Sequence, residues 1–210
     1  MVAYVKRFDT AYDRLREELE TVEDLRLVRV TTFESPFQPY VSHLPLVRGA
    51  TPPPADVLDQ LRAESRAALS AAINSEDEFL LKAYHEVMLD SLIHELNFVR
   101  SLLGEPDSLD YVEIRPTGVT AALKFGEVPC VINWIDLPGF TRYRQEFSFI
   151  GSDRRLTLAF PSPFLRNAPA TREIEGGIPG APTGYLVIRK AIKAKRIKVA
   201  QVEKPKKGKK

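Results

Sequence analysis

Five apolar stretches, rich in β-branched and aromatic residues, follow one another between residues 111 and 160. They recur at intervals of about ten residues, with Gly, Pro, Ser and Asp in the short turns between them. Connections this short join antiparallel strands, because parallel neighbours need a crossover of about a dozen residues or more. The stretches are 111–115, 119–125, 128–137, 143–151 and 155–160. The sequence therefore predicts an antiparallel meander in this half of the chain.

Helical patterns precede the meander. The longest runs from residue 75 to residue 104, where Ser75 and Glu78 predict a capping box and Gly104 predicts the helix end. Helices followed by a run of strands are typical of an α+β fold. We therefore expect an open, mainly antiparallel β-sheet with helices packed on one face. The other expected elements are helices at 9–20 and 55–73, strands at 2–5 and 25–33, and a proline-rich loop at 35–54.

The composition fits one domain with a buried core, since 44% of the 210 residues are hydrophobic. No apolar run approaches the roughly 20 residues of a membrane span, and the first residues do not resemble a signal peptide. The single cysteine, Cys130, excludes an intrachain disulfide and fits a reducing compartment. We therefore expect a cytoplasmic protein. No metal site is expected either, because the sequence has no cluster of Cys and His ligands.

Charge is distributed unevenly along the chain. Residues 189–210 contain 11 Lys or Arg and one acid, whereas the rest carries 19 bases against 27 acids. We therefore expect a domain over residues 1–180 and a basic, flexible tail over residues 181–210. A basic tail also attracts nucleic acid non-specifically. The tail carries few aromatic residues for base stacking, so nucleic acid is not the expected partner.

Asp90 and His94 are spaced one helical turn apart in the long helix. On a wheel of about 100° per residue they lie opposite the apolar stripe, on the polar side of the helix. An aspartate at this spacing raises the imidazole pKa and fixes its tautomer, as proton transfer requires. The same spacing is also typical of an ordinary ion pair on a solvated helix. The apolar stripe consists of Leu81, Tyr84, Met88, Leu92, Leu96, Val99 and Leu103.

The segment from Asp90 to His94, continued by Arg100-Ser-Leu-Leu-Gly104-Glu-Pro106, resembles the D-x-x-x-H helix of the Gfo/Idh/MocA oxidoreductases. This family includes glucose–fructose oxidoreductase and inositol dehydrogenase. Residues 2–14 resemble the entry into the family's C-terminal domain, and residues 132–164 resemble its sheet. The resemblance covers roughly residues 2–177. It implies an open, mainly antiparallel sheet with helices on one face, and a helix histidine that acts on the substrate hydroxyl beside a nicotinamide.

The sequence departs from the family where the cofactor would be bound. It has no G-x-G-x-x-G after a strand, and the family's catalytic lysine belongs to the Rossmann half. His85-Glu86-Val87 replaces the glycines that usually precede the aspartate. NAD(P) is therefore the cofactor that the resemblance implies, but we do not expect this chain alone to bind it.

Other site residues follow from the resemblance. His94 and Asp90 are the expected catalytic residues. Lys6 and Arg7 lie at the domain entrance, where the family's equivalent arginine approaches the substrate cleft. Tyr40 and His43 lie in the proline-rich loop, which faces the cleft in a two-domain enzyme. These four are the expected substrate-binding residues, although a surface pair and an ordered packing loop are the alternatives.

Three functions are compatible with the sequence. The first is the substrate-binding domain of a nicotinamide-dependent sugar or polyol oxidoreductase, inactive without a separate Rossmann subunit. The second is a non-catalytic binding or oligomerisation module that kept the fold, and the third is association with nucleic acid through the tail. We expect a homo-oligomer, because the open face of the family's sheet forms the subunit interface. The aromatic residues expected on that face are Trp134, Phe147 and Phe149.

Overall fold

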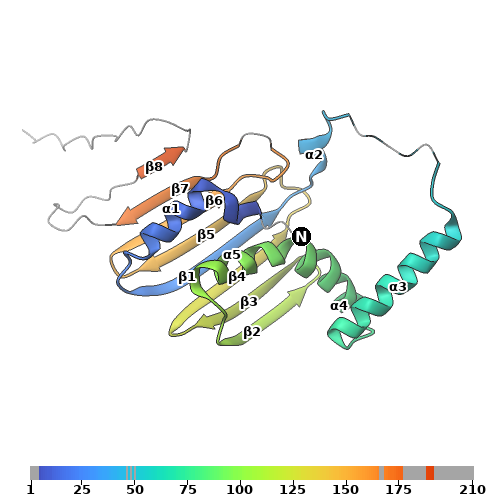
Figure 1. Ribbon diagram of the computed structural model, residues 1–210, viewed down its shortest axis with the longest axis horizontal. Helices are drawn as coiled ribbons and strands as arrows, with labels where there is room; N and C mark the ends of the chain where they lie inside the picture. The colour runs from blue at the N-terminus through green and yellow to red at the C-terminus, as the bar shows by residue number, and fades with distance from the viewer. Residues whose placement is uncertain are drawn as a thin grey trace, which may run out of the picture.

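An eight-stranded sheet forms the body of the protein in the computed structural model, in the order β2-β3-β4-β1-β5-β6-β7-β8 (Figure 1). The structure describes residues 5–45, 47, 49, 51–165 and 168–176, and the backbone of 188–191. All described pairings are antiparallel except that of β1 with β4. The open, mainly antiparallel sheet is thereby confirmed. The strands are β1 (Leu25–Glu34), β2 (Ser108–Arg115), β3 (Gly118–Phe125), β4 (Val128–Asp136), β5 (Arg144–Gly151), β6 (Arg154–Phe160), β7 (Thr171–Gly176) and β8 (Ile188–Ala191).

Two helices cover one face of the sheet (Figure 1). They are α1 (Thr10–Leu19) and α5 (Ile93–Leu103), and the predicted α+β class with helices on one face is confirmed. An aromatic cluster holds both helices on the strands. Phe98 of α5 lies 4.1 Å from the ring of Phe147 on β5 and 5.4 Å from that of Tyr12 on α1, measured between ring centroids. Phe160 of β6 closes the cluster at 5.7 Å from Phe98.

The predicted long helix contains a π-helical stretch. It begins as α4 (Glu78–Lys82), continues with π geometry over Ala83–Leu92 (labelled η2), and ends as α5. The predicted capping box is wrong, because the side chain of Asp77 accepts the hydrogen bond from the Leu80 amide at 3.0 Å. Hydrogen bonds between residues five apart give more residues per turn than an α-helix has, so the 100° wheel misplaces the positions that follow.

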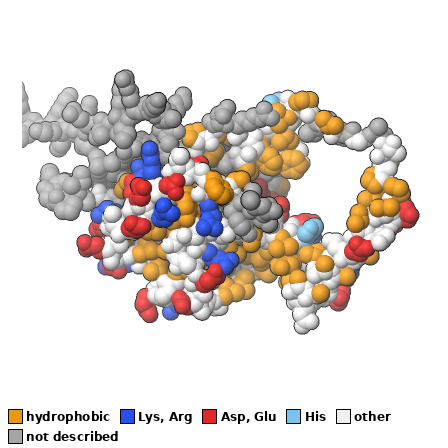
Figure 2. Space-filling view, viewed as in Figure 1, with side chains coloured by type: hydrophobic (Ala, Val, Ile, Leu, Met, Phe, Trp, Pro, Cys, Tyr) orange, Lys and Arg blue, Asp and Glu red, His pale blue; other side chains and the backbone are white. Residues whose placement is uncertain are grey.

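Two further predictions at the N-terminal end and in the loop need correction. Of the strand expected at 2–5, the structure describes only Val5, and this residue begins a 3-10 turn, η1 (Val5–Phe8), instead of a strand. The proline-rich loop includes a short helix, α2 (Gln38–Val41). The helix expected at 55–73 is confirmed as α3 (Ala55–Ile73), which has no buried residue. Figures 1 and 2 show it apart from the sheet, with apolar side chains along it.

The face of the sheet opposite the helices is polar at its centre, contrary to the sequence prediction. The three aromatic residues expected there lie on the helix-covered face, where Trp134 is 7% exposed and Phe147 and Phe149 are fully buried. On the open face, Glu146 accepts hydrogen bonds from Arg144 and Arg155, and Arg29 lies 3.9 Å away. The prediction fails because two neighbouring strand positions always point to opposite faces, and the register was assigned one residue out.

Candidate functional site

A cluster of titratable side chains lies between the start of α5 and the end of the sheet where β1 finishes and β5 begins. Its members act on one another electrostatically although they come from four separate segments. The segments meet because β1 and β5 are paired neighbours and α5 packs over both. We call this set the polar cluster: Lys6, Glu34, His94, Glu95 and Tyr143.

Glu95 is the buried centre of the polar cluster, with no exposed surface. Its Oε1 accepts hydrogen bonds from Thr32 Oγ1 at 2.6 Å and from the Gln145 side-chain amide. Its Oε2 has no hydrogen-bond partner among the described residues, and neither has Gln145 Oε1. The charge of Glu95 acts on Lys6, Glu34, His94 and Tyr143.

His94 is half-buried, rather than on the solvated side of the helix as the wheel predicts. Burial lowers the pKa of His94 below its ordinary value of 6.5, and the nearby Lys6 ammonium lowers it further. Glu95 and Asp90 act in the opposite direction, with Asp90 the weaker of the two. The expectation that Asp90 sets a raised imidazole pKa is therefore wrong in its net direction. At neutral pH the imidazole is a neutral base.

Lys6 and Glu34 are the two charged residues of the polar cluster whose pKa values burial shifts. Burial lowers the pKa of Lys6, against the attraction of Glu95 and Glu34. Burial and the charge of Glu95 raise the pKa of Glu34, against hydrogen bonds from the Trp134 side chain and the Ser35 backbone. Burial, followed by Glu95 and Glu34, also raises the pKa of Tyr143. The polar cluster thus contains a neutral base, His94, beside a lysine, a glutamate and a tyrosine whose pKa values are shifted. Groups of this kind take part in proton transfer.

The His94 pKa can be measured directly, because the chain has only three histidines. We expect its imidazole to titrate below pH 6.5 in the native protein, and Lys6→Met to move the midpoint upward by removing a neighbouring cation. Because burial lowers the His94 pKa in the native protein, the unfolded chain binds the proton more readily. The contribution of His94 to the free energy of unfolding is therefore complete above about pH 6.5 and falls as the pH drops below that value.

Proton NMR titration of the imidazole signals tests this expectation in the wild-type protein and in Lys6→Met. A His94 midpoint at or above 6.5, or one that Lys6→Met leaves in place, would contradict the described electrostatics.

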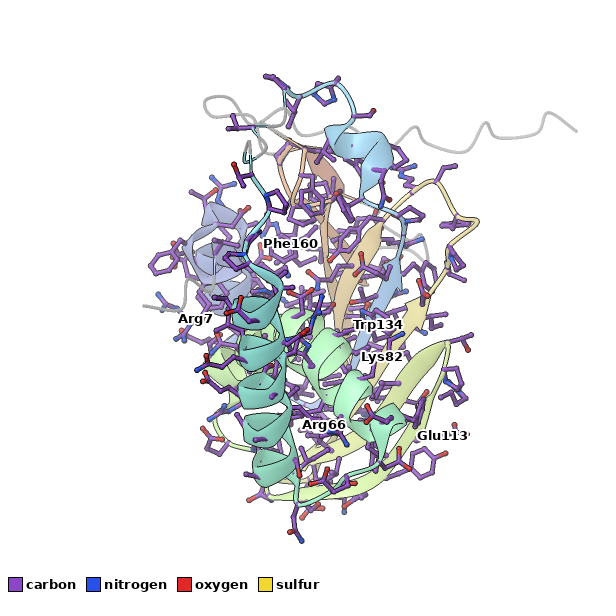
Figure 3. The ribbon with its side chains drawn as sticks, turned by 90° about the vertical axis from the view of Figure 1, so that its right-hand side faces the viewer. Arg7, Arg66, Lys82, Glu113, Trp134 and Phe160 are labelled. Atoms are coloured by element: carbon purple, nitrogen blue, oxygen red, sulfur yellow. The ribbon has the colours of Figure 1, made fainter. Side chains whose placement is uncertain are left out.

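The structure brings only some of the predicted substrate-binding residues to the polar cluster. Lys6 is part of it, whereas Arg7 is exposed and lies on the outer side of the molecule, away from Trp134 (Figure 3). His43 is exposed, just beyond α2. Tyr40 reaches the cluster indirectly, since its hydroxyl accepts a hydrogen bond from the Tyr143 amide at 2.9 Å.

Tyr40 and Tyr143 also line a hollow of about 770 Å³ at this end of the sheet. Its aromatic wall includes Phe33 and Phe140, whose rings meet edge to face with centroids 6.3 Å apart. Arg142 and Arg144 supply cationic groups to the same hollow. Arg144 and Glu146 place the hollow on the open face of the sheet, across from α5, and Tyr143 is the residue that the hollow and the polar cluster share.

The described helices do not fit the pyrophosphate of a nicotinamide cofactor, which needs free backbone amides at a helix N-terminus. Asp9 and Asp77 cap α1 and α4 with carboxylates, which repel an anion. α3 begins after three prolines and carries Asp56 in its first turn. In the part of the chain that the structure describes, no three His, Cys, Asp or Glu side chains are grouped as a metal site. Burial raises the pKa of the Cys130 thiol to about 12, which makes it unreactive.

Sequence reasoning missed Glu34, Glu95 and Tyr143. Glu95 follows His94 directly, and the 100° wheel places it within the apolar stripe, so its burial together with Leu92 and Phe98 follows from ordinary helical spacing. Glu34 and Tyr143 stand at strand ends that no local pattern brings together. A glutamate within the apolar stripe of the helix, next to the motif histidine, is the signal that the sequence offered.

The fold is similar to that of solved dehydrogenases. A 3-ketoreductase from Actinomadura kijaniata, solved with TDP-benzene and NADP, aligns at a TM-score of 0.52 and 13% identity over 90% of this chain. A dehydrogenase (MviM) from Clostridium difficile aligns at 0.51 and 12% identity over 91%. The alignments cover 47% and 46% of those proteins, so this chain spans about half their length. No protein-family model and no curated protein matches the sequence.

These solved structures are dehydrogenases of the Gfo/Idh/MocA type. The resemblance drawn from the sequence is therefore confirmed at the level of the fold: the chain has the fold of one half of such an enzyme. No helix among the described residues is long and apolar enough to cross a membrane.

Proposed function

We propose that this chain is the substrate-binding domain of a nicotinamide-dependent oxidoreductase that acts on a hydroxyl of a sugar or polyol. The observation that carries the proposal is His94, half-buried, neutral at physiological pH and set beside Lys6 in the polar cluster. The fold shared with half of a dehydrogenase supports it. Oxidation of a hydroxyl requires a base that takes the hydroxyl proton, and His94 fits that requirement.

The chain's own share in this function is to bind the substrate and to handle its proton. The imidazole of His94 accepts the hydroxyl proton, and the helix holds the ring in place. The Lys6 ammonium donates a hydrogen bond to the substrate oxygen and stabilises the negative charge that develops there. Asp90 and Glu95 stabilise the imidazolium that forms, since both favour the protonated ring.

The nicotinamide would be held by a separate Rossmann-type partner in this proposal. We expect the isolated chain to bind neither NAD(H) nor NADP(H), because its helices begin with capping carboxylates or prolines. Isothermal titration calorimetry checks this. A dissociation constant at or below about 10 µM, equivalent to about 7 kcal/mol, would contradict the expectation.

Reconstitution tests the proposed function itself. The chain is combined with a candidate nucleotide-binding subunit, such as one encoded beside it, and NAD(P)-dependent oxidation of a panel of polyols is followed. Activity that needs both components supports the proposal. A nucleotide-binding subunit that is equally active without this chain would refute it.

The second candidate is a non-catalytic binding or oligomerisation module, and the uncovered face of the sheet favours it. Helices cover only the opposite face, so self-association through the open face remains part of the proposal. The centre of that face is the ion-pair network around Glu146, so a contact there would be polar rather than the aromatic one that the sequence predicted. A matched nucleotide-binding partner favours the first candidate, and its absence favours the second.

A further inference from the structure

One carboxylate oxygen of Glu95 is buried and has no hydrogen-bond partner among the described residues. Both hydrogen bonds that it receives converge on Oε1, from Thr32 and Gln145, and Oε2 receives none. Gln145, which donates to Glu95, also has an unbonded buried oxygen, Oε1. Two acceptors in one hydrogen-bonded group therefore lack donors. Such groups are rare in folded proteins, since each unmade hydrogen bond destabilises the native state.

The surrounding side chains do not supply the missing hydrogen-bond donors. Lys6 is a cation on which the charge of Glu95 acts, yet no ion pair within 4.0 Å joins the two among the described residues. Glu34 is a further carboxylate and adds to the shortage of donors. A group that donates one hydrogen bond to Glu95 and accepts one from Lys6 would satisfy both residues.

We propose that Glu95 and Gln145 form a subsite for a ligand hydroxyl, adjacent to the hydroxyl on which His94 acts. A hydroxyl both donates and accepts, so it matches the carboxylate and the ammonium together. A cationic amine would be repelled by Lys6, and a carboxylate by Glu34 and Glu95. The ligand class is a neutral compound with neighbouring hydroxyl groups. The inference rests on the proposed function, because His94 supplies the neighbouring reactive position.

Glu95 and Gln145 have no exposed surface, so a ligand enters only if a neighbouring element is displaced, and we assign that movement to η1, which carries Lys6. That element, η1, is a turn of four residues without any buried residue, so its displacement disturbs no core packing. Thr32 and Gln145 lie on the paired strands β1 and β5, where Thr32 faces Gln145. Gln145 is thus held by the sheet and Glu95 by α5, and η1 is the part that we propose to move.

Glu95→Gln separates this role from a structural one. The amide has nearly the same shape, removes a buried charge and places a donor where Oε2 has no partner. We expect its melting temperature to rise by about 2–6 °C, because a cost present in the native state is removed. If Glu95 were present for stability, the same change would lower the melting temperature. A fall therefore overturns the proposal.

Glu18→Gln is the matched control. Glu18 also has an unbonded Oε2, but its Oε1 pairs with Arg172, away from the polar cluster. Loss of that ion pair leaves the buried Arg172 without its charged partner, so this variant should melt lower than wild type. A Glu18→Gln variant that melts higher would show that the gain in Glu95→Gln is a general charge effect, and the proposal would be withdrawn.

Ligand binding completes the test, with myo-inositol as the probe in saturation-transfer NMR and calorimetry. We expect Glu95→Gln to weaken binding by about 10- to 100-fold and Glu18→Gln to leave it unchanged. Equal affinity of wild type and Glu95→Gln overturns the subsite but leaves the proposed function standing, since the polyol still binds. Absence of inositol binding to wild type also overturns the subsite, and the proposed function is then decided by reconstituted activity alone.

Discussion

His94→Ala is expected to reduce the rate of the reconstituted enzyme by about 10²–10⁴-fold while the protein remains folded. The imidazole is the only side chain of the polar cluster that is an uncharged base near neutral pH, so its removal leaves the substrate hydroxyl without a proton acceptor. Because His94 is half-buried, the free energy of unfolding should fall by about 1 kcal/mol or less, which lowers the melting temperature by about 2–4 °C.

The steady-state rate and thermal melting must be measured on the same preparation. His85→Ala is the matched control, since His85 lies on the same helix, is exposed and is not part of the polar cluster. Its rate should equal that of wild type. A structural His94 would give the opposite pattern, in which melting falls strongly and activity follows the folded fraction. Undiminished turnover of His94→Ala in a fully active complex rejects the catalytic assignment.

Phe98→Ala should produce the largest loss of stability of any variant considered, about 3–5 kcal/mol. Phe98 is 1% exposed and contacts aromatic rings from α1, β5 and β6, so its removal leaves a cavity where the helix layer meets the sheet. Urea denaturation measures the loss as a lower midpoint with an unchanged slope, provided that unfolding stays two-state.

The matched control for this loss is Phe8→Ala, at a phenylalanine that is 83% exposed. Its free energy of unfolding should change by less than about 0.5 kcal/mol. A loss below about 2 kcal/mol in Phe98→Ala would contradict the described packing of α5. Since α5 carries His94 four residues earlier, Phe98→Ala should also lower activity.

Most of the fold could be predicted from local sequence patterns. The strands β2 to β6 follow from apolar stretches between short turns, and α1 and α3 follow from their periodicity. The position of β1 could not be predicted in this way. Its parallel pairing with β4 and antiparallel pairing with β5 depend on contacts between residues far apart in the chain. The faces of β4 and β5 were assigned wrongly because a register error of one residue exchanges the two faces.

The candidate site was predictable only where a motif marks it. The sequence identifies His94 and brings Lys6 into consideration, but it does not reveal Glu34 or Tyr143, which only the pairing of β1 with β5 brings close. Glu95 was missed for a different reason. It lies within the apolar stripe of the helix, but only the structure shows that its carboxylate is buried against Thr32 and Gln145. No residue pattern predicts the π-helical stretch over Ala83–Leu92. Stretches of this kind are frequent at functional sites, which fits the position of this one directly before His94.

The central position of β1 has a consequence for how the protein is made. Val28 of β1 pairs with Cys130 of β4 and Phe149 of β5, roughly 100 residues further along the chain. At about 5–20 residues per second, a ribosome completes β1 at least about 5 s before both neighbouring strands exist. During that interval both edges of β1 are unpaired. Unpaired strand edges promote the aggregation of nascent chains, and chaperones protect them. The pairing of β1 with both of its neighbours becomes possible only after residue 151 has been synthesised.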